Sequence, residues 1–152
     1  MASSDNAQTT VHLGLKLLDN YVFEIDFGDF GKIITDEPEP LGQGEGPNPS
    51  HLLAASIANC LAASLMFAVR KFKGDPGALS AQAELSMHRV NGRLRVEKTD
   101  VTLQLGNAYE NLPHIDKVLA QFEEFCVVTQ SVREGFEVNV EVRDLNGDIA
   151  KP

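Results

Sequence analysis

The stretch from Leu52 to Val69 contains no charged side chain, and this feature constrains the fold more than any other. It favours one long helix that begins at about Ser50, a good N-cap residue, and ends at about Lys73, before a Gly/Pro-rich turn. Its many alanines make it only moderately apolar, which favours a central helix buried on most sides over a transmembrane span. Because a chain of 152 residues can hardly enclose such a helix, we expect a homodimer.

The segments around this helix alternate as antiparallel strands do. Residues 11–30 predict two or three short strands. Residues 79–88 and 93–105 predict a hairpin, since the Asn91-Gly92 dipeptide between them is favoured in two-residue turns. The sequence therefore indicates an α+β fold with antiparallel sheets.

Further elements are expected towards the C-terminus. Apolar residues over 113–125 form one helical stripe, so a second amphipathic helix is expected to deliver Cys126. A short helix over 127–133 and a final strand over 136–142 follow. The chain is expected to be one domain over residues 1–152, with residues 1–10 and 145–152 flexible.

The charge balance argues against two classes of partner. The net charge of -9 disfavours binding to nucleic acid or to an anionic membrane surface. Residues 1–10 are polar and lack both a basic start and an apolar run, so they do not resemble a secretory signal. We therefore expect a cytoplasmic protein, in which two cysteines are either inert core thiols or a redox pair.

Cys60 and Cys126 are the candidate chemical groups. Cys60 lies in the middle of the predicted helix, where a small buried hydrophobe is the simpler interpretation and the helix dipole gives a thiolate little help. Cys126 continues an apolar stripe and lacks C-x-x-C spacing, so it suggests neither a thioredoxin-type centre nor a zinc site. If the two approach in space, they form a dithiol couple.

The remaining polar motifs predict neither a metal nor a cofactor. The four histidines are scattered, with no pair at metal-ligand spacing. The Gly42-x-Gly44-x-Gly46 run lacks the Lys-Ser/Thr of a phosphate-binding loop. On the predicted helix His51 faces away from Cys60, whereas Ser50 faces nearer the side of the cysteine.

Taken in order, several motifs resemble the OsmC-like family, which includes the organic hydroperoxide resistance proteins. The most specific is the Gly-Pro-x-Pro entry to an Ala-rich helix with a Cys in its middle, paired with a second Cys after a later helix. The segments that carry the resemblance are Thr35–Pro38, Gly46–Ala55, Ala58–Cys60 and Phe125–Val128. The resemblance implies an OsmC-like fold, an intertwined homodimer with long central helices packed between antiparallel sheets and active sites at the interface.

The resemblance also implies a thiol peroxidase active in oxidative stress defence. Cys60 would attack an organic hydroperoxide and become a sulfenic acid, Cys126 would condense with it to a disulfide, and a dithiol reductant would restore the pair. The sequence departs from the peroxidase pattern at two points. Ser50 stands where those enzymes have a Glu, and no Arg precedes Arg70, although Lys16 or Lys32 could supply positive charge. The chain is closer to the broad OsmC-like branch.

Two other hypotheses stay open at this point. The missing Arg and Glu suggest a non-catalytic dimer that binds a small apolar ligand at its interface. Ser50 and His51 belong to the peroxidase hypothesis, as supporting residues beside Cys60 and Cys126. The uncharged helix alone suggests a membrane-anchored protein. Loss of free thiols on addition of a peroxide would favour the thiol peroxidase over both of these alternatives.

Overall fold

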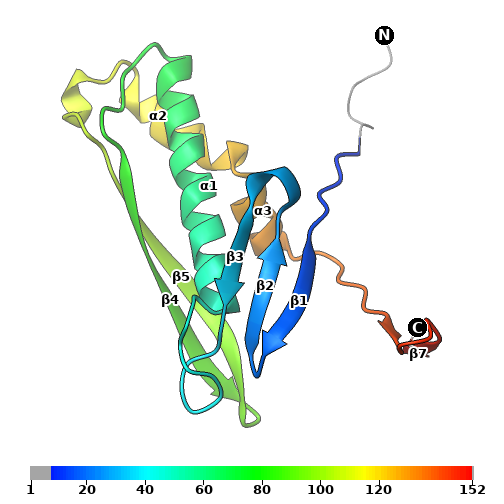
Figure 1. Ribbon diagram of the computed structural model, residues 1–152. Coiled ribbons are helices and arrows are strands. Elements are labelled where there is room, and N and C mark those ends of the chain that lie inside the picture. Colours follow the sequence, from blue (N-terminus) through cyan, green and yellow to red (C-terminus); the bar gives the residue numbers. More distant parts are fainter. Residues whose placement is uncertain (1–7, 152) are drawn as a thin grey trace. The chain divides into compact units, whose positions relative to one another are not determined.

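The computed structural model describes residues 8–151 (Figure 1). The chain divides into two compact units. The first unit extends to Ala55 and the second begins at Ser56, so that the boundary falls within the long helix α1 (Pro49–Lys71). Most of the predicted flexible segment 1–10 lies outside the described residues. The single-domain expectation stays a prediction.

The first unit is built on a three-stranded antiparallel sheet, as the alternation predicts. Its strands are β1 (Gly14–Asp19), β2 (Val22–Asp26) and β3 (Lys32–Thr35), in the order β1-β2-β3, with the 3-10 helix η2 (Gly28–Phe30) between β2 and β3. Glu24 on the central strand contacts Lys32 at 2.9 Å and Lys16 at 3.6 Å. The hydrogen bond from Lys32 lowers the pKa of the Glu24 carboxyl. Both lysines are therefore engaged in ion pairs within their own sheet.

The acidic Gly/Pro-rich loop after β3 is organised by the buried carboxylate of Asp36. Its oxygens accept hydrogen bonds from the backbone N–H groups of Glu37 (2.8 Å), Gln43 (3.0 Å) and Glu45 (3.1 Å). A Cβ on Gly42 would lie 2.3 Å from the Asp36 Oδ1 atom, so only glycine lets the loop close around it. The glycine run that superficially resembles a phosphate-binding loop thus folds around an internal anion.

The N-terminus of α1 is capped by Asn48 and not by Ser50. Asn48 Oδ1 accepts the backbone N–H of His51 at 3.1 Å, and His51 Nδ1 accepts the N–H of Asn48 at 3.1 Å. This reciprocal pair is the arrangement of a capping box, with His in place of Glu. Pro49 then occupies the first helical position, where its missing N–H costs nothing. Ser50 lies inside the first turn.

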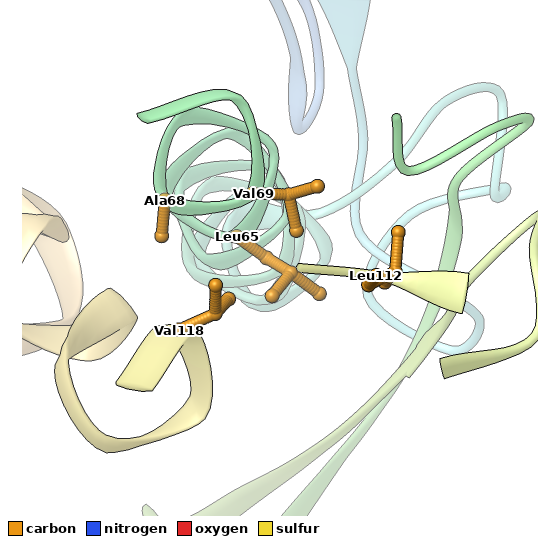
Figure 2. Packing of buried hydrophobic residues seen from close by; sticks show 5 residues of the cluster. All are labelled: Leu65, Ala68, Val69, Leu112 and Val118. Atoms are coloured by element: carbon orange, nitrogen blue, oxygen red, sulfur yellow. The ribbon is translucent and has the colours of Figure 1, made fainter. Parts of the chain in front are cut away.

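The core of the second unit is formed where α1 meets α2 (Ile115–Gln121) and the residues before it. Figure 2 shows the five buried side chains at its centre, which are Leu65, Ala68, Val69, Leu112 and Val118. Ala68 of α1 and Val118 of α2 are both fully buried in this cluster. By length and composition α1 also passes for a membrane span, but a core helix of a soluble protein does so equally well.

The helix α1 is buried along one face, whereas the sequence predicted burial on most sides. Ile57, Leu61, Ser64, Leu65 and Ala68 are buried at helical spacing. Ser56, Asn59, Ala63 and Phe67 lie on the other face and are exposed. The single chain covers one face of the helix, and the expectation that a second copy covers the other face stays a prediction.

The predicted hairpin is present as β4 (Ser80–Val90) and β5 (Arg93–Gln104). Asn91 and Gly92 both have positive φ, 50° and 77°, as a type I′ turn requires. The apolar residues of β5 fall at even positions up to Val96 and at odd positions from Val101. A bulge reconciles them, because Ser86 pairs with Lys98 and Met87 with Val96, which leaves Glu97 as the extra residue.

The second predicted amphipathic helix is shorter than expected. After the 3-10 turn η3 (Tyr109–Asn111), α2 ends at Gln121, and Phe122–Phe125 form the 3-10 helix η4. Cys126 is extended, with φ -85° and ψ 96°, and α3 (Val127–Glu134) begins directly after it. The prediction that Cys126 continues a helical stripe was wrong, because the residue caps the next helix and must leave the helical region to do so.

The predicted final strand over residues 136–142 is reduced to its last residue. In the described chain, residues 136–141 form no strand, and β6 (Val142–Arg143) pairs only with β7 (Ile149–Lys151). The tail after Asp144, expected to be flexible, thus contains β7. Phe136, Val138 and Val140 are 54% exposed or more. Their alternation needs a neighbouring strand, and the described chain offers none.

Asp36 gives the first testable prediction. Hydrogen bonds, the strongest from the N–H of Glu45, lower its pKa, so its contribution to stability is present above the unfolded value of about 3.9 and is lost as pH falls through the folded pKa. Asp36→Asn should lower the thermal unfolding midpoint at pH 7 by several degrees, because an amide leaves loop N–H groups unpaired. The exposed Asp29→Asn is the control, and equal midpoints for the two variants, measured by circular dichroism, would contradict the role of Asp36.

Candidate functional site: a pair of adjacent thiols

The structure brings Cys60 and Cys126 together within the second unit. Cys60 lies on α1 and Cys126 lies between η4 and α3, and the two thiols are close enough for each to shift the pKa of the other. Both are free thiols. Cys126 is completely buried, whereas Cys60 is partly accessible. The two sulfurs are therefore adjacent although 65 residues separate them in the sequence.

The N-terminus of α3 faces both sulfurs. Cys126 is the N-cap residue of α3, and its sulfur accepts the N–H of Thr129 at 3.4 Å. The backbone N–H groups of Val128 and Thr129 also act as donors to Cys60. Because these N–H groups have no partner inside the helix, they favour a negative charge on a nearby sulfur. The N-terminus of α3 thus favours a negative charge on Cys60, which the position of this residue in the middle of α1 does not do.

Two hydroxyl groups complete the surroundings of Cys126. Its sulfur lies 2.9 Å from Thr129 Oγ1, within the buried interior. Ser64, also buried, is the second hydroxyl that contacts this sulfur. A hydroxyl accepts a hydrogen bond from a thiol and, by rotation, donates one to a thiolate. The pocket of Cys126 therefore suits both protonation states.

The two thiols differ in acidity. Burial raises the pKa of the Cys60 thiol and the neighbouring Cys126 raises it further, against the N–H groups of α3. Burial also acts to raise the pKa of Cys126, but hydrogen bonds with Cys60, Thr129 and Ser64 outweigh it, so that this pKa lies below the ordinary thiol value.

The other residues considered for the site lie in the first unit. Ser50 and His51 belong to the first unit, where His51 caps α1, and a supporting role for them stays a prediction. Lys16 and Lys32 are paired with Glu24. Among the groups in residues 8–151 that shift the two thiol pKa values most, none is an arginine or a lysine. In that same range no cluster of three His, Cys, Asp or Glu side chains could hold a metal ion.

Sequence reasoning missed Ser64, Thr129 and Val128. The sequence spacing of Ser64 and of Thr129 could have indicated their place near the cysteines. Ser64 follows Cys60 by one helical turn and so lies on the same face of α1. Thr129 follows Cys126 by three residues, the spacing of an N-cap and its N3 partner. Recognising that spacing required knowing that the helix breaks at Cys126, which the apolar stripe concealed.

The fold and the site together define a mixed α+β protein with antiparallel sheets and a pair of adjacent free thiols. A family model for OsmC-like proteins matches residues 42–141, which is more than half of the chain. The chain belongs to the OsmC-like protein family. No curated protein sequence matches it.

Solved structures show the same fold. A protein assigned to the osmotic stress-induced and detoxification response of Psychrobacter arcticus superposes with a TM-score of 0.67 at 21% identity, over 83% of this chain and 90% of its own. The organic hydroperoxide resistance protein OsmC of Legionella pneumophila gives 0.63 at 20% identity, over 84% and 92%. OhrB of Bacillus subtilis, also an organic hydroperoxide resistance protein, gives 0.60 at 16% identity, over 80% and 90%.

Proposed function

We propose that the chain is a thiol-dependent peroxidase that reduces small organic hydroperoxides through Cys60 and Cys126. The observation that carries this proposal is that two free thiols, one partly accessible and one buried, lie next to each other. The family includes proteins named for organic hydroperoxide resistance, which supports the choice of substrate. As in the sequence analysis, a dithiol reductant in the cytoplasm would return the oxidised pair to the thiol form.

The chemistry divides into two steps. The Cys60 thiolate attacks one peroxide oxygen, the O–O bond breaks, and Cys60 becomes a sulfenic acid while an alkoxide leaves and is protonated to the alcohol. The Cys126 thiolate then attacks the sulfur of that sulfenic acid, which forms the disulfide and releases hydroxide. Two electrons pass from the sulfurs to the peroxide. Adjacent sulfurs let the second step follow without a large movement.

Accessibility decides which cysteine attacks. The lowered pKa of Cys126 alone would favour it as the nucleophile. Its sulfur, however, is fully buried behind α1 and α3, so a hydroperoxide cannot reach it. Cys60 is partly accessible despite its raised pKa. We therefore assign the attack to Cys60 and the resolving step to Cys126.

The homodimer is part of the same proposal, and the unpaired segment 136–141 supports it. Phe136, Val138 and Val140 are exposed and alternate as on a strand with one buried face. The other face of α1 and the apolar face of the hairpin, with Met87 and Val96, are exposed as well. Exposed apolar area on this scale marks an interface. A second copy of the chain would cover it and would supply the missing strand partner.

Replacing each cysteine in turn tests the proposed division of work. Cys60→Ser should abolish consumption of an organic hydroperoxide such as cumene hydroperoxide, because it removes the attacking sulfur. Cys126→Ser should consume one equivalent and stop, with Cys60 as a sulfenic acid that dimedone traps. Peroxide loss and the mass of the dimedone adduct are the measurements.

The same assay also tests the alternative function, a non-catalytic dimer that binds a small apolar ligand. Consumption by Cys60→Ser at the wild-type rate would contradict the assignment of Cys60. The wild-type thiols could instead prove inert, with a small apolar molecule that co-purifies and is seen by native mass spectrometry. That result would contradict the peroxidase and favour the ligand-binding dimer.

Two single variants, each of which adds one charge at one of two adjacent positions, test the proposed dimer. Light scattering at micromolar concentration should give twice the chain mass of 16.6 kDa for the wild type. Val138→Glu places a charge on the apolar face of the segment and should shift the protein towards monomer by about tenfold or more in dissociation constant. Asn139→Glu adds the same charge on the opposite face and serves as the control. A wild-type mass near 16.6 kDa would reject the dimer.

A further inference from the structure

We propose that formation of the disulfide between Cys60 and Cys126 releases the N-terminal cap of α3, so that the redox state of the pair controls how firmly this helix is held. The inference rests on the proposed peroxidase, in which one hydroperoxide oxidises the two thiols to the disulfide and becomes an alcohol and water. The element that responds is a helix of eight residues whose N-cap residue is Cys126 itself.

Cys126 caps α3 through two hydrogen bonds of its thiol group. Its S–H donates to Thr129 Oγ1 over 2.9 Å, and its sulfur accepts the backbone N–H of Thr129 over 3.4 Å. A side-chain acceptor at the N-cap satisfies an N–H group that the first helical turn leaves without a partner. The cap of α3 and the proposed resolving thiol are therefore the same sulfur atom.

The disulfide weakens both of these hydrogen bonds. A disulfide sulfur carries no proton, so Cys126 can no longer donate to Thr129 Oγ1. Bond formation also brings the two sulfurs from contact to covalent distance, so at least one of them must move. Cys60 is held inside the long helix α1, whereas Cys126 has extended backbone between two short helices. The sulfur of Cys126 is therefore the one that moves, and its contact with the Thr129 N–H is already long.

The first turn of α3 depends on this cap more than the rest of the helix does. Of the eight residues of α3, all of which the structure describes, only Thr129 is buried. Gln130 Nε2 donates to the Glu123 carbonyl over 3.1 Å, and Arg133 contacts the Glu123 carboxylate at 2.9 Å, so the later residues are tied to η4. Helices this short are marginal without such contacts. Loss of the cap is therefore expected to open the first turn and to leave the end of the helix attached.

An opening at this point gives the reductant access to the oxidised pair. In the reduced protein the sulfur of Cys126 is fully buried, which keeps the hydroperoxide away from it. The dithiol reductant must later place its own thiolate against a sulfur of the disulfide, and the exchange passes through a mixed disulfide. A released first turn uncovers the pair for this attack only after oxidation. When the two thiols return, the cap forms again and the turn closes.

Hydrogen exchange of the reduced and the oxidised protein tests the release of the cap. Diamide, a diazene that takes two electrons and two protons from a pair of thiols, forms the disulfide independently of any peroxidase activity. Peptides that cover residues 127–134 should then exchange about fivefold faster or more, which is the size of effect expected for loss of an N-cap. Peptides from β4 and β5 are the internal reference and should keep their rates. Mass spectrometry of the unreduced sample verifies that the disulfide joins Cys60 and Cys126.

Two variants keep the cap but cannot form the disulfide. Cys60→Ser leaves the Cys126 thiol on Thr129, and Cys126→Ser supplies a hydroxyl, which is a good helix cap. Diamide should leave the exchange of residues 127–134 unchanged in both, and circular dichroism establishes which of them is folded, so that either one can serve as the control. Unchanged exchange in the wild-type disulfide, or faster exchange in a treated variant, overturns the release of the cap.

A parallel wild-type sample is oxidised with cumene hydroperoxide, which separates this inference from the proposed function. A disulfide with diamide but none with the hydroperoxide overturns the peroxidase, while the diamide sample still decides whether the cap is released. A disulfide with both oxidants and unchanged exchange overturns the release of the cap alone. No disulfide with either oxidant overturns both, because the two thiols then do not act as a pair.

Discussion

The uncharged stretch of α1 must be covered, and the rest of the structure depends on how this is done. In the second unit, one face of the helix is covered by the core around Leu65, Val69 and Val118. The same face carries Leu61 and Ser64, so the contacts that bury the helix also bring α3 to its middle. Cys60 meets Cys126 as a consequence of packing, and the thiol pair is a product of the hydrophobic core.

The N-terminus of α3 changes the electrostatic surroundings of Cys60 in the middle of α1. Taken alone, Cys60 is a partly buried thiol with a raised pKa, which is a poor nucleophile at neutral pH. Next to it, the N-terminus of α3 stabilises a negative charge on Cys126 through Thr129. The two sulfurs thus differ in access and in surroundings: Cys60 is partly accessible, whereas Cys126 is buried and caps α3.

The sequence predicted those elements whose patterns are local. The hairpin could be predicted because Asn91-Gly92 favours its turn. The apolar residues of β5 change from even to odd positions between Val96 and Val101, which is the pattern that a bulge produces. The long helix could be predicted from its lack of charge. Its cap could not, because Ser50 and Asn48 are both good capping residues and only the reciprocal bond with His51 decides between them. The strand over 136–142 was mispredicted because alternation does not reveal whether a partner strand exists.

The two cysteines could be chosen from the sequence by resemblance, but their surroundings could not. Thr129 and Ser64 are separated by most of an α+β unit, and only the fold brings them to one sulfur. The central claim is that Cys60 and Cys126 act as one redox couple. Peptide mapping by mass spectrometry after one equivalent of an organic hydroperoxide tests it most directly. A single intramolecular disulfide that joins the peptides of Cys60 and Cys126 is the predicted result, and two unmodified thiols or a disulfide between chains would contradict the account.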